Sequence, residues 1–205
     1  MKTSSIRITA LAAISAASLF AGNASAESQY GSGAAGSTIT AQARVNLSVV
    51  VPKLILLRVG ASGGTIDTVS WTSAFSVSTA PTTPLASTNN TAATWDGTAP
   101  TATSSPTSNI VPVYAWTNSS GGGNLSYTAT AFGAGGPTLG NVTVSAGAGL
   151  AHPTPTALAA ASTGSITFPT ATVATGTWTY ALGGTPATWQ AGTYTSVVTY
   201  TATSI

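Results

Sequence analysis

The chain has 205 residues and no cysteine, and only 4% of its residues are charged, with a formal net charge of +2. The absence of cysteine excludes a disulfide scaffold, and 43% hydrophobic residues with almost no charge is not the composition of a disordered chain. So few cations leave no basic patch for phosphates, so we expect no nucleic-acid partner.

Residues 1–26 predict a cleaved signal peptide. Lys2 and Arg7 form a basic start, Ile8 to Phe20 is an apolar stretch, and Ala24-Ser25-Ala26 is a small-x-small cleavage site. The apolar stretch is shorter than the about 20 residues that span a bilayer. An amphipathic first helix would show polar residues at 3.6-residue spacing, which this stretch lacks. We therefore expect export, through a periplasm, to the cell surface or the extracellular medium.

Cleavage after Ala26 would leave a mature chain close to neutral. Its three cations balance its three carboxylates: Arg44, Lys53 and Arg58 against Glu27, Asp67 and Asp96. Such a surface repels other copies weakly, so self-association is expected. No later segment is long and apolar enough to cross a membrane as a helix, so we expect no transmembrane segment in the mature chain.

A flexible leader over residues 27–37 precedes the strongest periodic signal of the sequence. Apolar residues occupy every second position from Ile39 to Val51, with polar residues between them up to Ser48. This period-2 alternation predicts a β-strand over 38–51, longer than the usual five or six residues. The apolar face consists of Ile39, Ala41, Ala43, Val45, Leu47, Val49 and Val51.

Further strands are predicted along the rest of the chain. Pro52 ends the alternating segment, and Lys53 to Val59 is a short apolar run typical of a buried strand. Residues 65–77 contain a strand-like mix, and the polar stretch 79–109 is long enough to conceal an edge strand. Residues 110–117 and 125–132 flank a glycine loop and predict a β-hairpin. Further short strands are expected at 141–145, 165–168 and 176–182, and residues 156–162 are the one mature stretch that could turn helically.

The last strand follows Gly192. Tyr194, Ser196, Val198, Tyr200 and Ala202 share one face, and threonines dominate the other. Many short strands, frequent Gly and Pro turns and little helical patterning predict an all-β fold, an antiparallel β-sandwich over 38–205 as a single domain.

The mature chain offers few groups for catalysis or metal binding. Its single histidine, His152, lies in a Gly- and Pro-rich stretch and is expected to be a solvated loop residue. Asp67 and Asp96 are the available carboxylate pair within the domain, and each reads more simply as a turn residue. We therefore predict no enzyme, no metal site and no cofactor.

Aromatic residues support one alternative function. Five tryptophans could stack on sugar rings, although aromatics in a sandwich are more often core residues: Trp71, Trp95, Trp116, Trp178 and Trp189. Trp95 is the best candidate for an exposed ligand contact because it precedes Asp96-Gly97 in a polar stretch. The alternative is therefore a secreted monomeric binding module for carbohydrate or another surface.

Both ends of the mature chain resemble subunits of bacterial chaperone–usher pili. The resemblance rests on the segment ITAQARVNLSVVV and the ending AGTYTSVVTYTATSI, and cysteine-free major subunits are the most similar branch. It implies an immunoglobulin-like sandwich that lacks one strand, which the N-terminal segment of the next subunit supplies. It also implies a periplasmic chaperone and an outer-membrane usher as partners, a donor strand at Ile39–Val51 and a C-terminal strand with Tyr194, Val198 and Tyr200. The residues alone leave open whether 38–51 pairs within one chain or between chains.

Overall fold

The computed structural model describes residues 27–77, 89–90, 92 and 94–205. The signal peptide predicted at 1–26 lies outside the described residues. The chain divides between Val51 and Pro52 into two units. We call residues 27–51 the N-terminal extension and Pro52–Ile205 the body. This division separates the alternating segment 38–51 from the rest of the domain predicted over 38–205.

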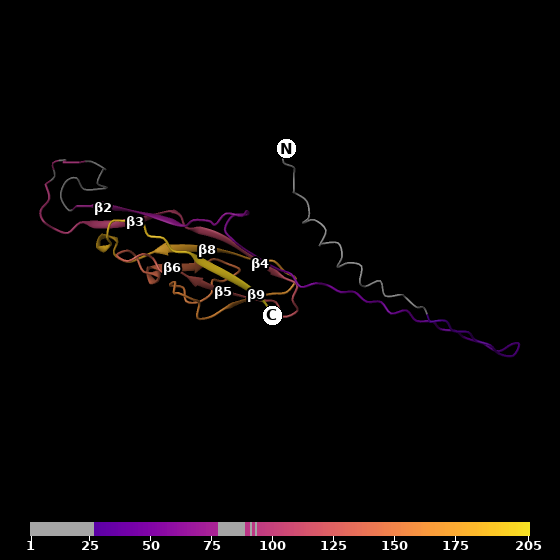
Figure 1. Cartoon of the computed structure of the whole chain (residues 1–205). Helices are drawn as coiled ribbons and strands as arrows, with labels where there is room; N and C mark the ends of the chain where they lie inside the picture. The colour runs from indigo at the N-terminus through magenta and orange to yellow at the C-terminus, as the bar shows by residue number, and fades with distance from the viewer. Residues whose placement is uncertain (1–26, 78–88, 91, 93) are drawn as a thin grey trace, which may run out of the picture. The chain divides into compact units, whose positions relative to one another are not determined.

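The described part of the body is built from short strands and two single-turn 3₁₀ helices (Figure 1). The strands are β1 Ile55–Val59, β2 Ser70–Ser76, β3 Thr101–Ser108, β4 Ile110–Thr117, β5 Gly123–Ala129, β6 Val142–Ala146, β7 Ile166–Phe168, β8 Ala174–Leu182 and β9 Val198–Ser204; the helices are η1 Leu139–Asn141 and η2 Pro186–Thr188.

All strand pairs in the described residues are antiparallel, and they form three sheets. One sheet has the order β1-β4-β8-β6, a second has the order β7-β5-β9, and β2 pairs with β3 alone. The β2–β3 ribbon adjoins the first sheet along the chain, because only Asn109 separates β3 from β4. The Asn109 side chain donates to the Tyr180 carbonyl at 3.0 Å, which fixes this junction on β8.

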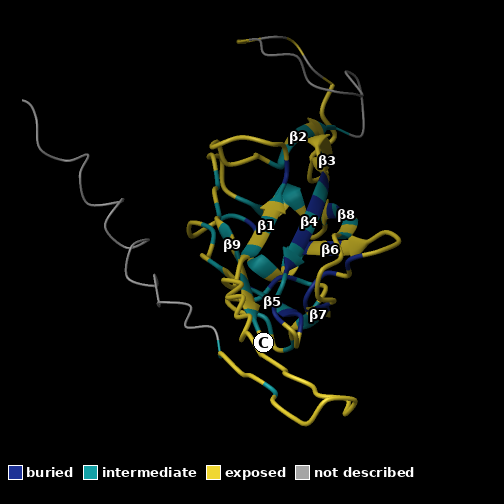
Figure 2. Ribbon diagram, turned by 90° about the vertical axis from the view of Figure 1, so that its right-hand side faces the viewer, coloured by how far each residue is buried: buried dark blue, intermediate teal, exposed yellow. Residues whose placement is uncertain are grey.

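One core joins the two larger sheets. In β4, Val111, Val113 and Ala115 are buried while the residues between them are more exposed, as period-2 alternation requires (Figure 2). Trp178 of β8 and Leu125 of β5 are completely buried in the same cluster. Because both sheets contribute to one core, the body is an all-β, antiparallel fold consistent with a β-sandwich.

Most of the strands predicted after residue 52 are present, and the polar stretch before residue 109 does contain a strand, β3. The strand predicted over 38–51 is not formed within the chain. The hairpin predicted at 110–132 is wrong. Its strands β4 and β5 belong to different sheets, and the glycine loop carries the chain from one sheet to the other. The loop is packed closely: Gly122 has a φ of +76°, and a Cβ on Gly123 would lie 2.3 Å from the Phe168 ring. These glycines are required by close approach rather than by a two-strand turn.

The helical turn considered for residues 156–162 is also wrong. This segment is extended and bonds to both larger sheets. On the β6 side, Val144 N–H donates to the Thr156 carbonyl and Leu158 N–H donates to the Val142 carbonyl, each at 2.8 Å. On the β5 side, Ala129 N–H donates to the Ala160 carbonyl at 2.9 Å. Backbone partners on β6 and β5 outweigh the helix propensity of three consecutive alanines. The segment therefore closes the side of the sandwich between β6 and β5.

We expect a side-chain truncation in the core to destabilise the fold much more than one at the surface. Leu125→Ala should lower the free energy of unfolding by about 2–5 kcal/mol, because it removes a fully buried side chain from a site shared by both sheets. Val173→Ala, at an exposed position, should change it by about 0.5 kcal/mol or less. Denaturant unfolding of the two variants measures both values, and equal effects would contradict the shared core.

Candidate functional site

The side of the sandwich between β1 and β9, opposite the side that residues 156–162 close, is open. Within the described residues, β1 pairs only with β4 and β9 pairs only with β5. The two strands are nevertheless neighbours in space, one at the edge of each larger sheet (Figure 2). We call this pair of adjacent strand edges the open edge. A strand edge presents unpaired backbone N–H and C=O groups and is a template for a further strand.

Apolar side chains of the open edge reach into the core but are only half buried. They are Ile55, Leu57 and Val59 of β1 and Val198, Tyr200 and Ala202 of β9. Their burial alternates with more exposed neighbours along each strand, so both strands turn one face toward the core. A further apolar strand at this edge would complete the burial of both rows.

Alternating apolar residues of the N-terminal extension are exposed. Residues 38–51 form no strand, and the large apolar side chains among them project into solvent, with Leu47 89% exposed and Val49 86% exposed. Figure 1 shows this segment as a long trace without arrows. Exposed apolar rows of this length are typical of interaction surfaces in folded proteins. The structure thus describes an apolar segment outside the sheets and, separately, an open edge in the body.

The leader of the extension makes hydrogen bonds within the extension. Ser37 N–H donates to the Ala34 carbonyl at 3.1 Å in a turn, and Arg44 bonds both carboxylate oxygens of Glu27, at 2.9 and 3.1 Å. The Arg44 guanidinium lowers the pKa of the Glu27 carboxyl, and the carboxylate raises the pKa of Arg44. The ion pair engages the polar face of the alternating segment and leaves its apolar face uncovered.

A buried aromatic cluster lies behind Tyr200. The Tyr200 hydroxyl bonds His152 Nε2 at 2.8 Å and the Tyr180 hydroxyl at 2.7 Å. The rings of Tyr127 and Trp178 pack against both His152 and Tyr200. The expectation of a solvated His152 is wrong, because only 5% of the residue is exposed. Pro153 is also fully buried, so what reads as a loop in the sequence is a covered segment of the core.

Burial also sets the ionisation of this cluster. Desolvation lowers the pKa of His152 to about 4 and raises the pKa values of Tyr180 and Tyr200 above their usual range. Near neutral pH the cluster is therefore uncharged. It is a hydrogen-bonded support beneath β9, and sequence reasoning missed it because the residues come from distant parts of the chain.

The two aspartates have local structural partners. Asp67 Oδ2 accepts from Ala61 N–H at 2.7 Å across the turn after β1, and Asp96 Oδ1 accepts from the backbone and hydroxyl of Thr98. Both are the turn contacts expected of an aspartate. The Trp95 ring is 60% exposed, while its N–H donates to the Thr98 carbonyl at 2.7 Å. Neither aspartate belongs to a group of three or more potential metal ligands, since none occurs within the described residues.

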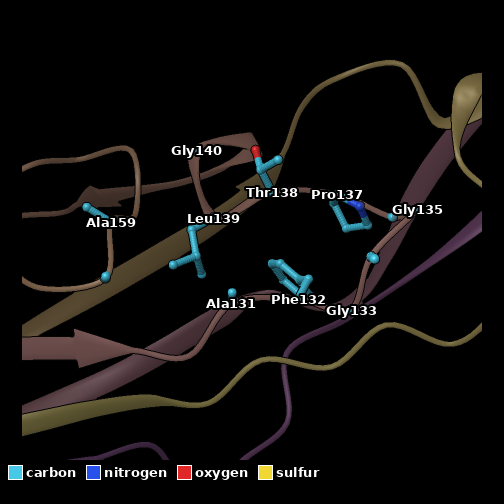
Figure 3. A pocket seen from close by; sticks show the side chains of 12 residues that line it. Ala131, Phe132, Gly133, Gly135, Pro137, Thr138, Leu139, Gly140 and Ala159 are labelled. Atoms are coloured by element: carbon cyan, nitrogen blue, oxygen red, sulfur yellow. The ribbon is translucent and has the colours of Figure 1, made fainter.

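A shallow hollow of about 410 Å³ lies beside η1 (Figure 3). Phe132, Pro137 and Leu139 supply its larger apolar side chains, and the remaining lining is mostly glycine and alanine. The Thr138 hydroxyl is engaged with the Asn141 side chain at 3.0 Å. The hollow therefore offers apolar surface rather than groups that could transfer a proton or hold a metal.

Comparisons with known proteins found no matching family, no matching curated protein and no matching solved structure. Among the helices of the described residues, none has the length and apolar character needed to span a membrane.

The His152 cluster predicts a loss of stability in mild acid. The unfolded chain binds a proton near pH 6.5 and the folded chain only near pH 4, so stability should be complete above about pH 6.5 and fall as the pH drops toward 4. The loss should reach about 3 kcal/mol. Denaturant unfolding at pH 7.5 and 4.5 measures it, and His152→Phe should flatten the dependence. An imidazole that titrates near 6.5 in the folded protein by NMR would contradict this assignment.

Proposed function

We propose that this protein is an exported structural subunit that assembles with copies of itself by β-strand complementation, in the manner of a pilus subunit. The segment Ile39–Val51 of one copy adds to the open edge of the next. One observation supports this most strongly. The segment with the most regular alternation in the sequence is exposed and lies outside the sheets, while two adjacent strands of the body, β1 and β9, each have an unpaired edge.

The difference between the two sides of the sandwich supports a strand supplied by another copy. Residues 156–162 already close the side between β6 and β5 with bonds to both sheets. The side between β1 and β9 has no such segment among the described residues. In this proposal a strand added there completes an immunoglobulin-like sandwich, and the extension carries the alternating apolar pattern that such a strand needs.

Burial gives the complementation its strength. Ile39, Val45, Leu47, Val49 and Val51 are large apolar residues on one face of the segment. Full burial of each side chain stabilises by about 1.5–3 kcal/mol. The added strand also gains backbone hydrogen bonds to edges that otherwise face water. With no cysteine in the chain, burial and hydrogen bonding are the means by which such a fibre would hold together.

The path of the chain favours a head-to-tail fibre. The extension joins the body at Pro52, directly before β1, and the loop that follows β4 contacts both Leu54 and the C-terminal Ile205. Pro52, to which the extension is bonded, therefore lies at the end of the body where β9 finishes. If bodies stack by simple translation, the arriving segment enters at the opposite end and runs antiparallel to β9. Such a contact does not close on itself and extends as a fibre.

An exposed apolar segment and an open edge would also need protection before assembly. We propose that a periplasmic chaperone covers the open edge after export and that an outer-membrane usher delivers subunits to the surface. The mature subunit would then act at the cell surface as part of an adhesive or structural fibre, without enzymatic activity, metal or cofactor.

Charged substitutions on the two faces of the segment test the proposal. Leu47→Asp or Val45→Lys should abolish assembly, because each places a charge in the apolar interface. Arg44→Ser alters the opposite face and should leave assembly intact. Size-exclusion chromatography and negative-stain microscopy of the secreted protein are the measurements.

Two outcomes would contradict the proposal. Discrete monomers in which residues 38–51 resist proteases would show that the segment pairs within its own chain. Fibres formed equally well by Leu47→Asp would show that assembly uses another surface.

A further inference from the structure

A loop at the end of β4 holds the first residues of the body, directly after the N-terminal extension ends. We call residues Thr117–Gly122 the terminal clamp. Asn118 Oδ1 accepts from Leu54 N–H at 2.7 Å, and Asn118 Nδ2 donates to the Pro52 carbonyl at 2.7 Å. The Thr117 hydroxyl donates to the Leu54 carbonyl at 3.0 Å. One side-chain amide thus bonds the backbone on both sides of Lys53, as a neighbouring strand would.

The same loop also holds the end of β9. Ser119 Oγ bonds the Ile205 carbonyl, and Ile205 N–H donates to the Gly122 carbonyl at 3.0 Å. A Cβ on Gly121 would lie 2.8 Å from the Ile205 side chain, so the loop fits closely around the chain end. Thr117 and Ser119 are buried, which makes the clamp a fixed part of the body rather than a mobile turn.

The chain has little freedom between the clamp and the apolar face of the extension. Val51, the last residue of that face, is bonded directly to Pro52. Proline fixes its own φ near −65° and restricts the preceding residue to extended conformations. Because Pro52 has no N–H, its carbonyl is its only backbone hydrogen-bonding group, and Asn118 engages it. No flexible linker separates the segment from the body.

We infer that Asn118 is a positioning residue that sets the direction in which the extension leaves the body, and thereby the angle between consecutive subunits. This inference rests on the proposed function. In a fibre, the extension of one subunit is held in the body of the next subunit. If the direction in which the extension leaves its own body is fixed, the joint between the two bodies is stiff. Removal of the Asn118 side-chain amide leaves the joint to Pro52 and to two bonds on the Leu54 carbonyl, from the Thr117 hydroxyl and from the Asn118 backbone N–H.

Asn118→Ala tests the inference, with Asn109→Ala as its matched control. Asn109 precedes β4 as Asn118 follows it, and its amide also donates to a backbone carbonyl, that of Tyr180, but away from the extension. Asn118→Ala fibres should bend irregularly, with a persistence length at least about two-fold below wild type, whereas Asn109→Ala fibres should remain as straight as wild type. Negative-stain images of the full mature chain give the persistence length, and thermal unfolding monitors the fold.

Asn118→Asp extends the series. This variant keeps the acceptor for Leu54 N–H and loses the donor to the Pro52 carbonyl, so its fibres should be intermediate in stiffness. It also provides the test if Asn118→Ala fails to fold. Folded Asn118 variants that cannot form fibres while Asn109→Ala can would support the positioning role. Fibres of wild-type stiffness from the Asn118 variants would overturn it. A wild-type chain that forms no fibres would instead refute the proposed function, and this inference with it.

Discussion

Assembly by strand addition depends on the unpaired backbone groups at the open edge. Each residue of β1 and β9 carries a backbone donor and acceptor, and the outward-facing groups of these two strands have no strand partner among the described residues. The half-buried row that includes Leu57 and Tyr200 lies along the same edges. The core of the body already joins both sheets, and the open edge could gain both hydrogen bonds and burial from one more strand.

The buried aromatic cluster and the terminal clamp both support β9 at this edge. Tyr200 is held from inside by His152 and Tyr180, and Ile205 is held at the end of the strand by the clamp. An edge strand without a second neighbour would otherwise fray. A strand held at both places and without charged residues is a suitable template for an incoming apolar segment. The scarcity of charge in the whole chain fits the same purpose, since charged edges are a common protection against strand addition.

Local residue patterns predicted many of the strands. Short runs of apolar and aromatic residues predicted β1, β4 and β8, and alternation predicted β9, although β9 begins only at Val198 and so excludes Tyr194. The most regular alternating segment, 38–51, forms no strand within the chain. The failures arose where long-range packing decides. Residues 156–162 have the composition of a helical turn but bond β6 of one sheet and β5 of the other. The glycine loop after β4 packs closely against Phe168 and Ile205 and leads into the other sheet. His152 and Asn118 could not be found from spacing, because their partners lie 48 and 64 to 66 residues away.

Amide hydrogen exchange of the full mature chain, measured in dilute and in concentrated solution, shows whether residues 39–51 pair between copies. We expect residues 39–51 to exchange freely in dilute monomers and to become protected on assembly, together with the outward amides of β1 and β9. Protection of residues 39–51 that is already complete in dilute monomers would contradict pairing between copies. So would assemblies in which this segment still exchanges freely.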